Sequence, residues 1–280
     1  MALVNILCLA NSKKIQGRCL AGLTWPHLET WIRPVEPTSE HGEVPNHRAM
    51  VDTPEGRRFI RPLDVISVEL REPVPAPAQP ENWILGSTPI TLVEVLEPAE
   101  VENRLRSVAD NSTSVFGLGG SREIPESEAS RGLPMSIALF EVDSLLFARD
   151  DRDKWRLNFR FNGVSHRRFP ISDLELLDNL ERRESSQVSD QRGWFLTISA
   201  TEPFLGGRGP ISRWLTIAAG IRIPLAVSGN GVRARAPSSN TPGDNKWVTC
   251  PNRNCGQRNL RTIVERPALD GKCWSCRRNL

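Results

Sequence analysis

Four cysteines near the end of the 280-residue chain have the types and spacing of a metal site. They are Cys250, Cys255, Cys273 and Cys276, in two short turns, C-P-N-R-N-C-G and C-W-S-C, with seventeen residues between Cys255 and Cys273. Tetrahedral Zn²⁺ takes four thiolates at about 2.3 Å, and two cysteine turns that face each other across a hairpin supply them. We therefore expect residues 247–280 to form a zinc ribbon with Zn²⁺ as its cofactor.

Two disulfides are the alternative use of these four thiols. The first turn is unusual for a zinc site, because four residues separate its cysteines where two are commoner. The apolar run at residues 3–10 (LVNILCLA) is too short for a secretory signal, and no run of eighteen apolar residues predicts a membrane span. We expect a cytoplasmic protein, and in that reducing compartment metal binding explains paired thiols better than oxidation does.

Charge is distributed unevenly along the chain. The formal net charge is +3, but from Arg233 onward ten basic residues accompany three acidic ones, so this part carries +7 and the preceding residues carry −4. Clustered Lys and Arg gain affinity for polyanions by releasing counterions. A nucleic-acid partner is therefore one interpretation of the basic module, and solubility is the other.

The apolar pattern predicts a mainly β protein. Short alternating runs, bounded by Gly, Pro and Asn, predict strands at residues 3–10, 17–23, 30–35, 64–71, 90–96, 137–147, 155–161, 166–170, 194–200 and 214–223. Two helices interrupt them. One is expected to begin at Pro98, and Ser172 is expected to cap the other, with Glu175 three residues later.

The clearest hairpin covers residues 154–170, where Asn162-Gly163 supplies the positive φ angles of a type I′ turn. Its first strand alternates between polar residues and four apolar ones, which are Trp155, Leu157, Phe159 and Phe161. Such a strand lays one face on a core and presents a basic face outward.

Two polar segments divide the chain into domains. Residues 109–134 are rich in Gly and Ser, and residues 228–246 have the composition of a flexible tether. They leave β units at residues 1–108 and 135–227, each with about five strands and one helix, which fits small closed or partly open barrels.

Several segments resemble the dual-OB domain proteins of prokaryotes. ILCLANSKKIQGRCLAG, WIRPV, PLDVISVEL and QPEN resemble parts of the first barrel of such proteins, and WRLNFRFNG, PISD, FLTISATEPF and WLTIAAGI resemble parts of the second. The resemblance implies two OB-like barrels in tandem and suggests nucleic-acid binding, and it implies no catalytic residues. The zinc ribbon lies outside it.

A mixture of hydroxyl, basic and aromatic side chains surrounds the turn after the first expected strand and comprises Ser12, Lys13, Lys14, Arg18, Trp31 and Arg33. Proteins that bind single strands combine a basic groove with flat groups for stacking, worth about 1–3 kcal/mol per base. Further candidates lie on the 154–170 hairpin and in the tail, and are Arg156, Arg160, Arg167, Arg168, Arg258 and Arg261. The alternatives are a solvated turn with Trp31 in the core, and an exposed strand face that needs no ligand.

No catalytic motif is present among those we sought: the sequence has no P-loop, H-E-x-x-H, G-x-S-x-G or G-x-G-x-x-G pattern. Cys8 and Cys19 lie in apolar strands, where inert thiols are expected. We therefore predict a non-catalytic protein that binds nucleic acid, preferably single-stranded. One alternative is a protein-interaction adaptor whose ribbon docks a partner. Another is a metal-dependent nuclease that uses acidic residues such as Asp150, Asp151 and Asp153.

Overall fold

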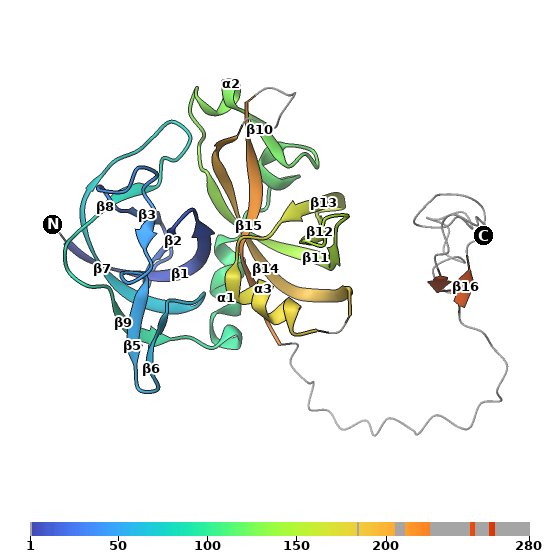
Figure 1. Ribbon diagram of the computed structural model, residues 1–280, viewed down its shortest axis with the longest axis horizontal. Coiled ribbons are helices and arrows are strands. Elements are labelled where there is room, and N and C mark those ends of the chain that lie inside the picture. The colour runs from blue at the N-terminus through green and yellow to red at the C-terminus, as the bar shows by residue number, and fades with distance from the viewer. Residues whose placement is uncertain (1, 184, 205–210, 225–246, 250–257, 261–280) are drawn as a thin grey trace. The chain divides into compact units, whose positions relative to one another are not determined.

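The computed structural model describes residues 2–183, 185–204, 211–224, 247–249 and 258–260 (Figure 1). The chain divides into two units, Met1–Ala226 and Val227–Leu280. The described residues are mainly β, which confirms this part of the predicted fold class, and both expected barrels belong to the first unit.

Five strands of the first sheet form a closed ring. They follow the order β1-β2-β3-β8-β7, and β7 pairs back with β1. Neighbouring strands are antiparallel except β3 and β8, which are parallel. The strands are β1 (Ala2–Lys14), β2 (Gly17–Thr24), β3 (Trp31–Val35), β7 (Asp64–Pro73) and β8 (Asn82–Leu85). Closure leaves no free edge within this ring.

Shorter elements surround the first ring. β4 (Val44–Pro45) pairs with β2, β9 (Thr91–Val95) pairs with β7, and β5 (Met50–Thr53) forms a hairpin with β6 (Gly56–Phe59). Helix α1 (Pro98–Val108) then begins at the predicted proline and buries Val101 and Leu105 on one face.

The second sheet is curled and repeats the strand succession of the first. Its order is β10-β15-β14-β11-β12-β13, and a parallel bridge between Ile171 and Ile217 brings the end of β13 to β15. This contact occupies the position of the parallel β3–β8 pair in the first ring. The strands are β10 (Glu123–Pro125), β11 (Ile137–Arg149), β12 (Trp155–Phe161), β13 (Val164–Pro170), β14 (Gln187–Phe204) and β15 (Ser212–Arg222).

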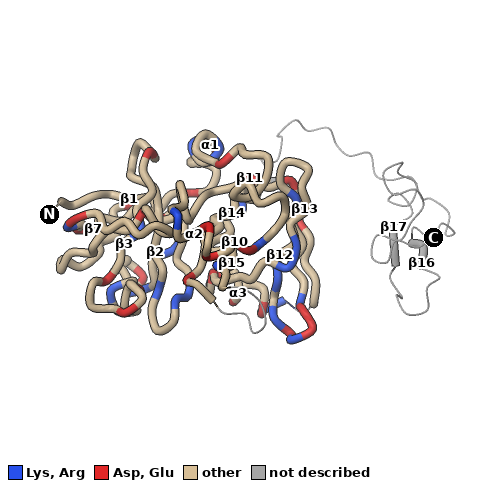
Figure 2. Tube along the Cα trace, turned by 90° about the horizontal axis from the view of Figure 1, so that it is seen from above, with Lys and Arg blue, Asp and Glu red and all other residues tan. Residues whose placement is uncertain are grey.

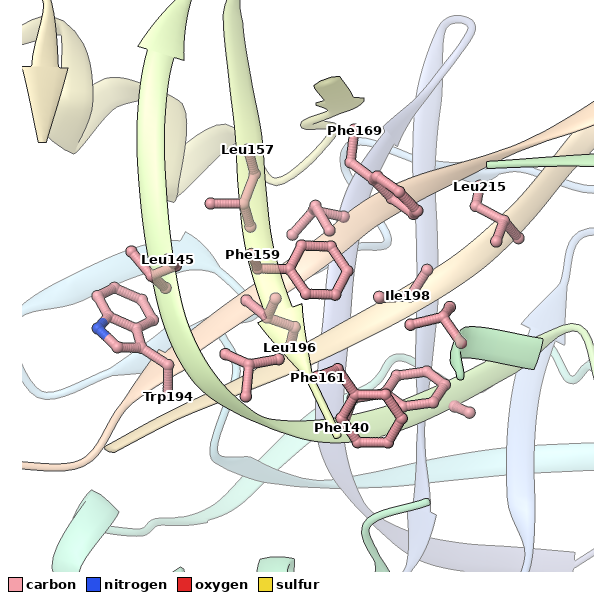
Figure 3. Close-up of a cluster of buried hydrophobic side chains, with 14 of the residues drawn as sticks. Phe140, Leu145, Leu157, Phe159, Phe161, Phe169, Trp194, Leu196, Ile198 and Leu215 are labelled. Carbon is pink, nitrogen blue, oxygen red and sulfur yellow. The ribbon is translucent and has the colours of Figure 1, made fainter. Parts of the chain in front are cut away.

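The core of the second barrel confirms the predicted alternation in β12. Its four apolar side chains are buried, and Figure 3 shows Phe159 and Phe161 on the same side as Phe140 from β11. The rings of Phe140 and Phe161 meet edge to face with centroids 5.2 Å apart. Asn162 (φ 46°) and Gly163 (φ 80°) both have the positive φ that the predicted type I′ turn requires.

Residues 6–10 of strand β1 are buried on both faces because the two barrels pack against each other along them. Ile6 and Cys8 point into the first barrel, whereas Leu7 and Leu9 pack with Leu139, from β11 of the second barrel. A strand covered on both sides needs a continuous apolar run, which explains why residues 6–10 (ILCLA) do not alternate.

Residues 109–134 form more than the polar linker expected. They contain a 3₁₀ turn (Val115–Gly117), β10 and α2 (Glu126–Ala129), and they place Val115 and Ile124 in the core of the second barrel. The apolar residues of this segment are too few and too irregularly spaced to give a recognisable period.

The prediction for the second helix was wrong in its cap. Asp173, not Ser172, caps α3 (Leu174–Glu181), and its side chain accepts a hydrogen bond from the Leu176 amide. The Ser172 hydroxyl instead donates to the Ile217 carbonyl at 3.1 Å.

The second unit is described over two short strands. β16 (Trp247–Thr249) and β17 (Arg258–Leu260) form an antiparallel pair. The four cysteines of the predicted zinc site lie outside the described residues, as does the tether predicted at residues 228–246.

Candidate functional site

A pocket of about 600 Å³ lies between the two barrels. The first barrel contributes the β1–β2 turn, Arg33 of β3 and Gln79 of the β7–β8 loop, and the second contributes the ends of β13 and β14 and the start of β15. Hereafter we call it the inter-barrel pocket. Its volume lies in the range of about 300–1,000 Å³ that is usual for small-ligand sites.

Hydrogen bonds between the barrels hold the β1–β2 turn in place. The Lys13 amide donates to the Ser172 carbonyl at 2.8 Å, and Ser12 forms a β-bridge with Asp173. Burial raises the pKa of the Asp173 carboxyl to about 6, although it accepts bonds from the amides of Leu176 and Gly220. The turn is therefore positioned by the strand-to-helix connection of the second barrel.

Arg33 is the most buried cation of the pocket. Its side chain comes from β3, is 1% exposed and donates from Nη2 to the Ser199 hydroxyl at 3.1 Å. Its Nε has no hydrogen-bond partner, and no carboxylate among the described residues forms an ion pair with it. A guanidinium remains charged in proteins, so the pocket wall holds a positive charge without a protein counterion among the described residues.

Glu202 is the acidic group of the pocket, and it is held by the first barrel. Lys14 Nζ and Gln79 Nε2 donate to its Oε1 at 3.0 and 3.1 Å. Burial alone would raise the pKa of this carboxyl, but the Lys14 charge and both hydrogen bonds bring it below its ordinary value. Glu202 is therefore ionised at neutral pH and neutralises Lys14, which leaves Lys13 and Arg33 as excess positive charge.

The inter-barrel pocket coincides with the ligand-binding face of an OB fold. OB barrels bind oligonucleotides and oligosaccharides across strands 2 and 3 and the loops between strands 1–2 and 4–5. In the first ring these correspond to β2, β3, the β1–β2 turn and the β7–β8 loop, and Cys19, Arg33, Lys14 and Gln79 respectively line the pocket from them.

The structure brings together part of the first predicted group. Ser12, Lys13, Lys14 and Arg33 all line the pocket. Arg18 is directed elsewhere, with its guanidinium 4.0 Å from the centroid of the Phe59 ring. Trp31 is half-buried and packs against the apolar clusters between the barrels.

The second predicted group forms a separate surface along β12 and β13, where Figure 2 shows basic and acidic residues close together. Arg156 pairs with Asp150 at 2.8 Å, and Arg168 pairs with Asp151 at 2.9 Å. Arg160 and Arg167 are exposed. None of these four arginines lines the inter-barrel pocket.

The remaining predicted residues have no described side chains. Arg258 lies in β17, while Arg261 and the four cysteines are outside the described residues. Cys8 is buried, and burial raises the pKa of its thiol. Within the described ranges, no cluster of three or more His, Cys, Asp or Glu could hold a metal ion.

Several pocket residues were missed by sequence reasoning, and Gln79, Glu202 and Trp214 are among them. Gln79 begins the QPEN segment that resembles the first barrel of dual-OB proteins, which was a usable signal. Glu202 lies just after the apolar run at residues 194–200, and Trp214 begins the apolar run at residues 214–223. Both runs have the pattern of core strands, and only the packing of the barrels brings these two residues to the pocket.

Comparisons with known proteins give one result. A search of curated proteins and a search of solved structures found no match. No helix in the described part of the chain has the length and apolar character needed to cross a membrane. Residues 4–220 match the family described as Dual OB-containing domain, and this match covers both barrels. The chain therefore belongs to the Dual OB-containing domain family.

Proposed function

We propose that the protein is a non-catalytic nucleic-acid-binding factor that holds a single strand across the inter-barrel pocket. OB folds commonly bind nucleic acids, and this pocket lies where an OB barrel receives its ligand. The observation that carries the proposal is the buried Arg33, which has no counterion among the described residues and lines the same pocket as the exposed cation Lys13. Phosphate groups are the anions that such a basic face would bind along a strand.

The C-terminal module has a supporting role in this proposal. Four thiolates from Cys250, Cys255, Cys273 and Cys276 bind one Zn²⁺ and stabilise a basic ribbon. The ribbon, linked to the barrels by residues 228–246, provides a second weak contact with the same strand. Tethered weak sites raise overall affinity because the second contact becomes intramolecular.

Titration of labelled single-stranded oligonucleotides at 50 and 200 mM salt tests the proposal. Each phosphate contact with a single strand contributes about 0.7 to the slope of log affinity against log salt. Lys13→Ala should therefore lower the slope by about 0.7, because Lys13 is exposed and forms no ion pair with any described residue. Arg71→Ala is the matched control, since Arg71 is also an exposed cation of the first barrel but lies outside the pocket.

A third variant distinguishes the two basic surfaces. Arg167 is exposed on β13 and does not line the pocket, so Arg167→Ala should leave the slope within error of the wild-type value. If Arg167→Ala lowers the slope and Lys13→Ala does not, the strand binds the second barrel's hairpin and the proposed site is wrong. If neither DNA nor RNA binds more tightly than about 10 µM at 50 mM salt, the adaptor function becomes the better account.

A further inference from the structure

Arg33 differs from the other largely buried arginines in its hydrogen-bond partners. Arg213 forms a two-pronged pair with the Glu126 carboxylate at 2.7 and 3.0 Å. Arg58 does the same with Asp64 at 2.7 and 2.9 Å, and Arg48 reaches Glu36 at 2.6 Å. Arg33 is more buried than any of them and has a single hydroxyl partner, Ser199, in the described structure.

An unpaired buried charge is costly, since desolvation of each ion costs several kcal/mol even after relaxation. A guanidinium cannot escape this cost by losing its proton. Its planar fork matches the oxygens of a phosphate or carboxylate with two parallel hydrogen bonds. Because the Arg33 Nε lacks a partner and the side chain lines the pocket, an anionic group from a ligand would complete it.

The rest of the pocket wall suits a flat apolar body attached to that anion. Trp214, Phe204, Pro170 and Pro203 contribute apolar surface. The Arg122 guanidinium lies 4.5 Å from the centroid of the Trp214 ring, a cation–π contact that favours this placement of the ring. Aromatic surfaces of this kind stack on nucleobases with little dependence on sequence.

We propose that the inter-barrel pocket binds a single unstacked nucleotide, with its phosphate on the Arg33 guanidinium and its base against Trp214. This inference rests on the proposed function and names the unit of the strand that the pocket takes. The Lys14–Glu202 pair lies in the same wall and presents a carboxylate that can accept hydrogen bonds from the sugar or base.

Calorimetric titration of the full chain with nucleoside monophosphates, the matching nucleosides and inorganic phosphate tests the subsite. The monophosphate should bind about 10- to 100-fold more tightly than the nucleoside, which is the range for hydrogen bonds to a charged group. In Arg33→Met this difference should disappear, while Arg71→Ala should keep it. Arg33→Met should also fold, because replacing an unpaired buried charge by an apolar side chain of similar length is not expected to destabilise the protein.

Two further arms identify the source of the nucleotide. Arg33→Lys keeps the charge but not the fork, so it should recover only part of the monophosphate preference. Oligonucleotides with and without a 5′-phosphate should differ in affinity if the pocket takes a strand end. If the two oligonucleotides bind the wild-type protein with equal affinity and binding is lost in Arg33→Met, the pocket takes an internal nucleotide.

The outcomes separate this inference from the proposed function. Strand binding that weakens in Lys13→Ala but not in Arg33→Met overturns the nucleotide subsite and leaves the proposed function intact. Monophosphates that bind through Arg33 while oligonucleotides do not bind support the subsite and overturn the proposed function. Equal wild-type affinities for nucleoside and monophosphate also overturn the subsite.

Discussion

Replacing His166 by phenylalanine should stabilise the protein, increasingly so at lower pH. His166 lies in β13 with no exposed surface, stacked on Phe159 with ring centroids 4.8 Å apart and edge-on to Phe169. Neither ring nitrogen has a hydrogen-bond partner. Each unsatisfied buried polar group costs about 1–3 kcal/mol. The slightly larger ring costs about 1–3 kcal/mol through overpacking, so we expect a net gain of about 1–2 kcal/mol at pH 7.5.

The pH dependence follows from the direction of the His166 pKa. Burial lowers this pKa, so the unfolded chain takes up the proton first, near the ordinary value of about 6.5. Above that pH, protonation of His166 does not reduce the free energy of unfolding. As the pH falls from that value toward the folded-state pKa, the free energy of unfolding decreases by up to about 1.4 kcal/mol per pH unit. His166→Phe removes this loss. The advantage of the variant should therefore widen below pH 6.5.

Urea unfolding followed by tryptophan fluorescence at pH 7.5, 6.5 and 5.5 measures the effect. The difference in stability between wild type and variant isolates His166, because the other titrating groups are present in both proteins. One of them is Asp173, whose pKa is raised by burial to about 6. His27→Gln, at an exposed histidine, should show no such trend. A stability difference that stays constant across the three pH values would refute the reasoning.

Three other predictions concern the connections between parts of the chain. Glu81→Ala should cost about 2–4 kcal/mol in urea unfolding, because Ser136 would lose the carboxylate that accepts from its amide and hydroxyl at 2.5 and 2.9 Å, and Glu81→Gln should cost less. Asp173→Ala should also cost about 2–4 kcal/mol by removing the α3 cap and the acceptor of the Gly220 amide, whereas Asp173→Asn should restore part of the loss. Elemental analysis should find one zinc per chain in the wild type and none in Cys273→Ser, with unfolding of the barrels unchanged; less than half an equivalent in zinc-replete, reduced wild-type protein would contradict the zinc site.

Local pattern predicted those parts of the fold that depend on local chemistry. The alternation in β12, the positive φ pair Asn162-Gly163 and the proline at the start of α1 each follow from neighbouring residues. The continuous apolar run in β1 predicted a strand but not the second barrel that covers its outer face. That face is buried by Leu139 and other residues more than a hundred positions away in the sequence.

The residue types of the candidate site could be predicted from the sequence, but the burial of its residues could not. Lys13, Lys14 and Arg33 stand out because basic residues cluster around one turn. Arg33 was expected on a strand beside that turn, but its burial was not, because its partner Ser199 is 166 residues distant in the sequence. Asp173 occupies the capping position predicted for Ser172, and local chemistry allows either residue there; the bond of the Ser172 hydroxyl to Ile217, 45 residues away, is the contact that local sequence does not reveal.

Photo-crosslinking of a single-stranded oligonucleotide that carries a photoreactive pyrimidine tests the central claim most directly. After irradiation of the full chain and protease digestion, mass spectrometry identifies the peptides that carry the crosslink. The account predicts crosslinks to residues 12–19, 199–204 or Trp214, at the walls of the inter-barrel pocket, with or without additional crosslinks in the C-terminal module. Crosslinks confined to β12–β13 or to residues 247–280, with none at the pocket, would contradict it.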